Sequence, residues 1–270
     1  MSDKKNMFGT YKIIPDSVNP PYSPTYPKEW GCSSMHMVEV ITRVDPKKIK
    51  AMFAKGSVPT PFEVTGDRVA FQFMTSQKHT MSYHNACMFD MRVTAPVRYE
   101  NYFAYTYLHL YNSDTVMILA GREVLGFPEK DCRYGFKEEK DGTVTGWVNR
   151  RGYAIADFAF TPDSKAPLVP LVEGGEQPEG ELHVRRVSDF AKIGTVYADV
   201  VYQNIPVRIA SETAGSIVMN LYGSEYDPLK DLEPEILSAS FKIFEGYDGS
   251  IKNAGRKLVK RRSLIAGVAG

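Results

Sequence analysis

Short apolar runs recur along the chain, and they predict a protein built mainly from β-strands. Glycine, proline, asparagine and aspartate residues separate most of these runs, as expected of turns. We expect strands at residues 37–43, 69–74, 86–94, 99–111, 142–148, 152–160, 183–187, 195–202, 205–210 and 236–245. The strands do not alternate with helices, so the pattern predicts a mainly β (α+β) protein with antiparallel, barrel-like or stacked sheets and a few short helices.

Three of the segments carry more specific local signals. Residues 45–53 are predicted to form a short helix, because Asp45 suits the N-cap and Pro46 suits the first helical position. Residues 115–120 form an apolar run that ends at Gly121, which we interpret as a buried strand. The strand at 99–111 is rich in tyrosine, which is typical of a core or of a cavity wall.

The chain of 270 residues can bury a large core, and we expect a single domain over residues 1–270. Proline and tyrosine are frequent in about residues 1–31, which predicts an extended arm on the surface or on a neighbouring subunit; a poorly ordered leader is the alternative. About residues 252–270 are basic and then apolar. This favours a solvated extension or an oligomer arm over a membrane contact, because stable anchoring takes two signals.

Composition narrows the class of protein. Hydrophobic residues make up 43% and charged residues 24% of the chain, as in globular proteins, and a net charge of +1 gives no reason to expect nucleic acid or an acidic membrane surface. The three widely spaced cysteines argue against a disulfide framework and for a reducing, cytoplasmic location. No run reaches the ~18 apolar residues of a membrane span. The histidine spacings do not favour a metal site.

Residues 121–130 bring several ionisable groups together around a glycine and a proline. They read Gly-Arg-Glu-Val-Leu-Gly-Phe-Pro-Glu-Lys. Such a segment can direct charges into a pocket, and the alternative is a solvated turn. The motif resembles the core motif of the acetoacetate decarboxylase family. Further resemblances follow in the family's order at residues 23–27, 42–45, 87–90, 95–97, 227–229 and 237–240.

The resemblance covers about residues 23–245 and implies an acetoacetate decarboxylase-like barrel or cone of β-sheet. It also implies a decarboxylase or C–C lyase that acts on a small β-keto acid or related keto acid, forms a homo-oligomer and uses no metal or organic cofactor. In this family a lysine forms a Schiff base with the substrate, and a second lysine lowers the pKa of the first. The family motif usually ends Pro-Lys-Lys, so Glu129 occupies the place of the nucleophile and Lys130 that of its helper.

Other family positions also differ in this chain. The glutamate of the active site corresponds to Asp90, and a second glutamate corresponds to Gln72. The arginine that receives the substrate carboxylate should lie near His36, which we take as a substrate-binding candidate. Arg122, in the core motif, is another candidate for holding an anionic group.

Three functions follow from these residues. In the first, Lys130 forms the Schiff base and Asp90 carries the proton; this requires the lysine pKa to fall by several units from ~10.4. In the second, Glu129 and Asp90 share a proton and act as acid and base in a lyase, hydratase, isomerase or C–C hydrolase without a Schiff base. In the third, the protein binds a small carboxylate without catalysis. Neighbouring strand residues face opposite ways, so only one of Glu129 and Lys130 need face the pocket; we take Lys130 as the first candidate.

Overall fold

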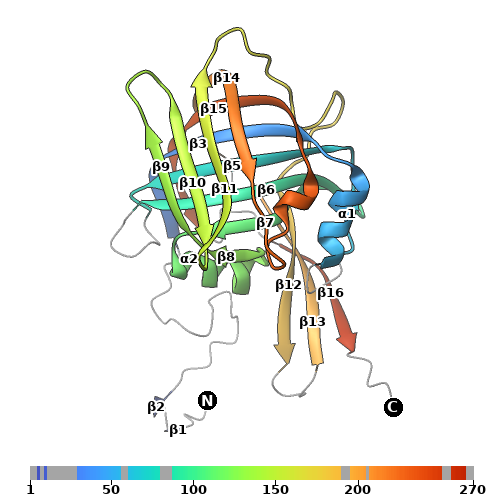
Figure 1. Ribbon diagram of the computed structural model, residues 1–270. Helices are drawn as coiled ribbons and strands as arrows, with labels where there is room; N and C mark the ends of the chain where they lie inside the picture. The colour runs from blue at the N-terminus through green and yellow to red at the C-terminus, as the bar shows by residue number, and fades with distance from the viewer. Residues whose placement is uncertain are drawn as a thin grey trace.

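The protein is folded around one large, strongly curved β-sheet, which confirms the predicted mainly β class (Figure 1). The computed structural model describes residues 5–6, 9–10, 29–55, 60–79, 87–189, 195–204, 207–250 and 257–265. Fourteen strands belong to this sheet, and their main path runs β16-β13-β12-β7-β6-β5-β3-β15-β14-β11-β10-β9 without closing among the described residues. Strands β4 and β8 pair with β6 and β7 beside this path, and β1 and β2 form a separate pair.

The bounds of the strands are β1 (Lys5–Asn6), β2 (Gly9–Thr10), β3 (Glu29–Arg43), β4 (Glu63–Val64), β5 (Arg68–Gln77), β6 (Met88–Tyr99), β7 (Tyr102–Asn112), β8 (Glu129–Asp131), β9 (Arg133–Glu138), β10 (Val144–Arg150), β11 (Tyr153–Pro162), β12 (Glu181–Asp189), β13 (Thr195–Gln203), β14 (Ile209–Leu221), β15 (Glu235–Ser250) and β16 (Lys257–Ile265). The helices are α1 (Pro46–Lys55), α2 (Thr115–Ala120), the π-helix η2 (Gly121–Leu125) and the 3-10 helix η3 (Leu229–Leu232). Among the described residues, no helix is long and apolar enough to cross a membrane.

The sheet curves until two of its regions face each other and enclose the main core. Strands β9, β10, β11 and β14 pass across β3, β5 and β6 (Figure 1). Aromatic rings from the two layers contact each other. The ring centres of Phe73 on β5 and Phe158 on β11 are 4.3 Å apart, and Phe89 on β6 stacks on Tyr134 of β9 with ring centres 4.5 Å apart. Strands β5, β6 and β7 are buried along most of their length, which explains their nearly continuous apolar sequences.

Almost all neighbouring strands are antiparallel, as predicted, but β7 also makes two parallel pairings, with β8 and with β12. Parallel neighbours require a long connection. The segment between β7 and β8 contains helices α2 and η2 and forms this connection. It brings residues 129–131 back beside β7.

The buried strand predicted at residues 115–120 is wrong, because these residues form helix α2. The carboxylate of Asp114 accepts hydrogen bonds from the N–H groups of Val116 and Met117 at 2.8 and 3.0 Å and so caps the helix. The apolar pattern did not reveal this because the helix is short and partly exposed: Leu119 keeps 51% of its surface in solvent.

Other local predictions are confirmed. The N–H of Lys47 donates to the Asp45 carboxylate at 2.8 Å, as expected of the helix N-cap at α1. A hairpin joins the strands predicted at 142–148 and 152–160, which are β10 and β11, and both of its central turn residues, Arg151 and Gly152, have positive φ values of 49° and 86°. The strand predicted at 205–210, in contrast, overlaps strand β14 only at residues 209–210, because β14 runs from Ile209 to Leu221.

The two chain ends differ in how far the prediction can be followed. Most of the arm at residues 1–31 lies outside the described residues, and its last three residues already belong to β3. The tail at 252–270 contains strand β16, which pairs with β13 and which the sequence pattern did not predict. Residues 252–256 and 266–270 lie outside the described residues.

Candidate active site

Strand β8 points its first two residues, both charged, to opposite faces of the sheet. It pairs in parallel with β7, with Glu129 beside Leu110 and Lys130 beside Tyr111. Because side chains alternate along a strand, Glu129 faces a cavity and Lys130 faces the other side. The motif therefore delivers its carboxyl group to the cavity.

The cavity has a volume of about 730 Å³, and the strands that contribute residues to its lining are β3, β5, β6, β7, β8, β12, β13, β14 and β15. Of the residues proposed from the sequence, Gln72, Asp90 and Glu129 line it. Lys130, Arg122 and His36 are not among the described residues that do so. The remaining walls combine polar side chains with methionine, leucine and aromatic residues. A volume of this size suits a ligand larger than the smallest keto acids.

Glu129 is a buried acid with only 4% of its surface exposed. Burial raises its pKa well above the usual value, the negative charge of Asp90 raises it further, and Arg92 and a hydrogen bond with Asn112 act in the opposite direction. Its Oε2 atom has no hydrogen-bond partner among the described residues. Burial therefore favours the neutral, protonated form of Glu129.

Gly121, the first residue of the charged motif, leaves the space that this carboxyl group occupies. A Cβ atom at Gly121 would lie 2.5 Å from the carboxyl carbon of Glu129 and 2.5 and 2.6 Å from its two oxygens. Any larger residue would displace the acid, so the glycine at the start of η2 positions the functional group at the start of β8.

Asp90, on β6, is the second buried carboxyl group of the cavity. Its Oδ2 accepts a hydrogen bond from Arg92 Nη2 at 3.0 Å, whereas its Oδ1 has no partner among the described residues. Burial raises the Asp90 pKa, and the adjacent Arg92 guanidinium opposes this effect. Since Asp90 has an ion-pair partner and Glu129 has none among the described residues, we expect Asp90 to ionise first. The pair thus provides one base and one acid.

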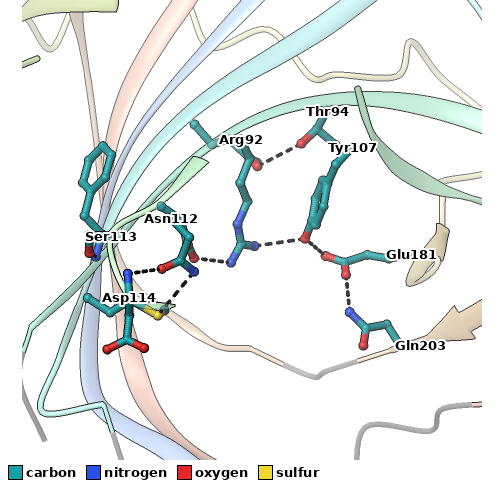
Figure 2. Close-up of polar contacts among 12 residues, drawn as sticks. Arg92, Thr94, Tyr107, Asn112, Ser113, Asp114, Glu181 and Gln203 are labelled. Carbon is teal, nitrogen blue, oxygen red and sulfur yellow. Dashed lines mark hydrogen bonds and ion pairs between the residues drawn. The ribbon is translucent and has the colours of Figure 1, made fainter. Parts of the chain in front are cut away.

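A continuous chain of hydrogen bonds runs from Arg92 through Tyr107 to Glu181 (Figure 2). Arg92 Nη1 donates to the Tyr107 hydroxyl at 3.2 Å, and this hydroxyl donates to Glu181. Gln203 Nε2 donates to the other Glu181 oxygen at 2.5 Å. Although burial alone would raise the Glu181 pKa, hydrogen bonds and charge from His183, Arg92 and Tyr107 lower it to about 2. Glu181 is therefore a fixed negative charge behind the guanidinium.

Gln72 belongs to a second polar group at the cavity wall. Its Nε2 donates to Glu39 Oε2 at 2.8 Å, and its Oε1 accepts from the Thr94 hydroxyl at 3.2 Å. Glu39 also forms a close ion pair with Lys242, which contacts Glu212 Oε1 at 3.4 Å. Among the described residues that line the cavity, Lys242 is the only lysine.

Lys130 belongs to an ion-pair cluster around Asp227, on the opposite face of β8. Its Nζ donates to Asp227 Oδ1 at 2.7 Å and to the carbonyl oxygen of Tyr226 at 2.8 Å. Arg150 Nη1 donates to the other oxygen of Asp227 at 2.9 Å, and the Tyr111 hydroxyl donates to Oδ1 at 3.1 Å. Burial lowers the Lys130 pKa, as an amine nucleophile would require, but Asp227 counteracts this effect.

The two remaining candidates also lie away from the cavity. His36 Nδ1 is 2.7 Å from Glu138 Oε1, and its ring contacts the edge of Phe241. Its neighbours on β3, Met35 and Met37, line the cavity instead. Arg122 lies exposed on η2. Its charge lowers the pKa of Glu129, but it offers no group to the cavity lining.

Several cavity residues were not identified from the sequence. They are Glu39, Arg92, Tyr107, Glu181 and Lys242. The aromatic strand at 99–111 was predicted to form a core or a cavity wall, and Tyr107 lies on it. The other residues lie on strands far apart in sequence, so no local motif connects them. The described residues include no group of three or more histidine, cysteine, aspartate or glutamate side chains placed to hold a metal ion.

Comparisons with known proteins agree on the family. The model of the acetoacetate decarboxylase family matches residues 14–246. Among solved structures, an acetoacetate decarboxylase is similar with a TM-score of 0.69 at 16% identity, over 90% of this chain and 94% of that one. An acetoacetate decarboxylase-like enzyme from Sphingomonas wittichii RW1 has a TM-score of 0.69 at 14% identity, over 85% of this chain and 93% of that one.

The enduracididine biosynthesis enzyme MppR, solved in complex with pyruvate, has a TM-score of 0.65 at 15% identity, over 90% of this chain and 92% of that one. A comparison with curated proteins found no match. At these identities the solved structures establish the fold, while the family model covers most of the chain and confirms the resemblance inferred from the motifs. The chain belongs to the acetoacetate decarboxylase family.

Proposed function

We propose that this protein is a lyase-type enzyme that acts on a carbonyl compound by acid–base catalysis, with Glu129 as the acid and Asp90 as the base. Family membership supports an enzyme of the lyase type. The observation that carries the proposal is the pair of buried carboxyl groups in one cavity, each with an oxygen that has no partner among the described residues. Leaving such atoms buried costs stability, so their retention favours a direct role toward a ligand.

The proposed step is the formation of an enol. Asp90 Oδ1 takes a proton from the carbon next to the substrate carbonyl, and the C–H electron pair becomes the second bond between the two carbons. The carbonyl oxygen meanwhile takes the proton of Glu129. Asp90 ends neutral and Glu129 ends ionised, so the total charge is unchanged. Departure of a group from the β-carbon, or return of the proton, completes a lyase or isomerase reaction.

A Schiff base at Lys130 has less support. The amine would have to leave Asp227 and cross to the other face of β8 to reach the cavity. We therefore do not include Lys130 in the mechanism. The keto-acid substrate expected from the resemblance stays a prediction, supported by a structural neighbour that was solved with pyruvate. A purely binding protein would not require two carboxyl groups that differ in protonation state.

The pH dependence of α-proton exchange tests this proposal. The replacement of α-protons by deuterium in 4-phenyl-2-butanone and 2-oxo-4-phenylbutanoate can be followed by NMR in deuterated water. Because the reaction needs ionised Asp90 and protonated Glu129, the enzymatic rate should rise as Asp90 ionises and fall again as Glu129 loses its proton, with both transitions above the ordinary carboxyl range. A rate that only rises toward alkaline pH, as a neutral lysine requires, would contradict the proposal.

A further inference from the structure

The described lining of the cavity contains more acidic than basic side chains. Among the described residues that line it, the carboxyl groups are Glu39, Asp90, Glu129, Glu181 and Glu212, and the permanently basic groups are Arg92 and Lys242. His79 also lines the cavity, and burial lowers its pKa, so it adds no charge near neutral pH. With Glu129 protonated, four carboxylates face two cations, which leaves an excess of two negative charges.

Two nitrogens of the Arg92 guanidinium already donate to protein partners. Nη2 donates to Asp90 at 3.0 Å and Nη1 donates to Tyr107 at 3.2 Å, whereas the buried Nε has no hydrogen-bond partner among the described residues. Behind Tyr107, the ionised Glu181 adds a second negative charge to the same network. A substrate carboxylate that approached Arg92 would lie close to Asp90 and to the ionised Glu181, and both negative charges would repel it.

The ammonium of Lys242 is similarly occupied. Glu39 is its close partner, and Glu212, directly opposite it on β14, is 3.4 Å away. Although burial lowers the Lys242 pKa, the two carboxylates raise it above the ordinary value, so the lysine stays charged and does not offer a neutral amine. One positive charge is shared by two negative ones, and this end of the cavity also carries a net negative charge.

The other lining groups suit an apolar, adaptable contact. Five methionines contribute to the walls: Met35, Met37, Met74, Met88 and Met117. Methionine side chains are flexible and polarizable, and they fit ligands of irregular shape. Together with Phe127 and Phe244, they make the wall of this cavity of about 730 Å³ largely apolar, with a few polar groups in it.

We propose that the substrate of this cavity carries no free carboxylate group and is instead an uncharged carbonyl compound with an apolar portion. The inference rests on the proposed function, because it concerns the same cavity and the same carbonyl position beside Glu129. A carboxylate entering here would lose its hydration and meet an excess of negative charge, while a ketone would lose little. The negative cavity would thus discriminate against the keto acids that the family resemblance suggests.

Binding of a matched ligand pair tests this inference. The ketone 4-phenyl-2-butanone and the keto acid 2-oxo-4-phenylbutanoate share the same phenylethyl ketone group and differ by a methyl group in place of a carboxylate. Calorimetry with the full-length Glu129→Gln variant avoids turnover and keeps a neutral group at position 129. We expect the ketone to bind at least about tenfold more tightly at pH 7. Equal or tighter binding of the keto acid, or no detectable binding of the ketone, would overturn the inference.

A charge change inside the cavity should alter this preference. Glu212→Gln removes one negative charge from the lining, so keto-acid binding should tighten by about threefold or more while ketone binding stays within about twofold. Glu245→Gln is the matched control, because Glu245 pairs with Arg208 and is not in the described lining. Equal effects of the two substitutions would contradict the inference. Failure of the proposed function would appear separately, as proton exchange that does not depend on Glu129.

Discussion

Replacing Glu129 with glutamine is expected to lower the rate of α-proton exchange by about 10²–10⁴-fold. The amide keeps the size of the side chain and its ability to hydrogen-bond, but it cannot give its proton to the substrate carbonyl. Lys130→Met is the matched comparison one residue along β8, because methionine fills similar space without an amine. We expect the rate for folded Lys130→Met protein to stay within about tenfold of the wild type, because Lys130 faces the other side of the strand.

Both rates should be measured well below the melting temperature of each variant, with circular dichroism to establish that the proteins are folded. Near-wild-type exchange in Glu129→Gln, combined with a complete loss in Lys130→Met, would reverse the assignment. Loss in both variants would show that the two faces of β8 are coupled more closely than the alternation of the strand implies.

The second large effect is expected at Asp227, on stability. Asp227 is 3% exposed, and its carboxylate neutralises both Lys130 and Arg150. Asp227→Ala should lower the free energy of unfolding by about 2–4 kcal/mol, since it leaves two cations without their shared partner, and the partial exposure of Lys130 reduces the full cost of a buried pair. Urea denaturation followed by fluorescence measures the change.

A double-variant cycle separates the ion pair from simple loss of packing at the same position. Because Asp227 and Lys130 act on each other, Asp227→Ala with Lys130→Met should cost less than the sum of the two single substitutions. Strictly additive effects, or a change below about 0.5 kcal/mol for Asp227→Ala, would mean that the cluster does not anchor β8.

The alternation of strand residues predicted that only one of Glu129 and Lys130 would face the cavity, but not which one. That choice depends on the pairing of β8 with β7, which forms only after helices α2 and η2 return the chain. The family motif placed Glu129 at the position of the nucleophile, and the structure places this residue in the cavity lining. The same alternation explains why His36, between two cavity-lining methionines on β3, faces away.

The carboxylates that surround Lys242 could not be predicted from local sequence. Glu39 and Lys242 are 203 positions apart, and they meet because β3 and β15 pair along most of their length. Glu181 and Arg92 likewise belong to β12 and β6 and are linked through Tyr107 on β7. Strand propensity predicted that these segments would be in a sheet, whereas strand order decided which polar side chains would share a cavity. The charge balance of the site is therefore a property of topology.

Borohydride reduction in the presence of a carbonyl ligand tests the central claim most directly. The protein would be incubated with 4-phenyl-2-butanone, 2-oxo-4-phenylbutanoate or pyruvate under conditions where α-proton exchange is measurable, then reduced and examined by intact-mass and peptide mass spectrometry. Since Lys130 lies across β8 from the cavity and Lys242 is held charged by two carboxylates, we expect exchange without a reduced adduct on either lysine. A stoichiometric adduct on Lys130, absent from Lys130→Met, would contradict the assignment of catalysis to Glu129 and Asp90.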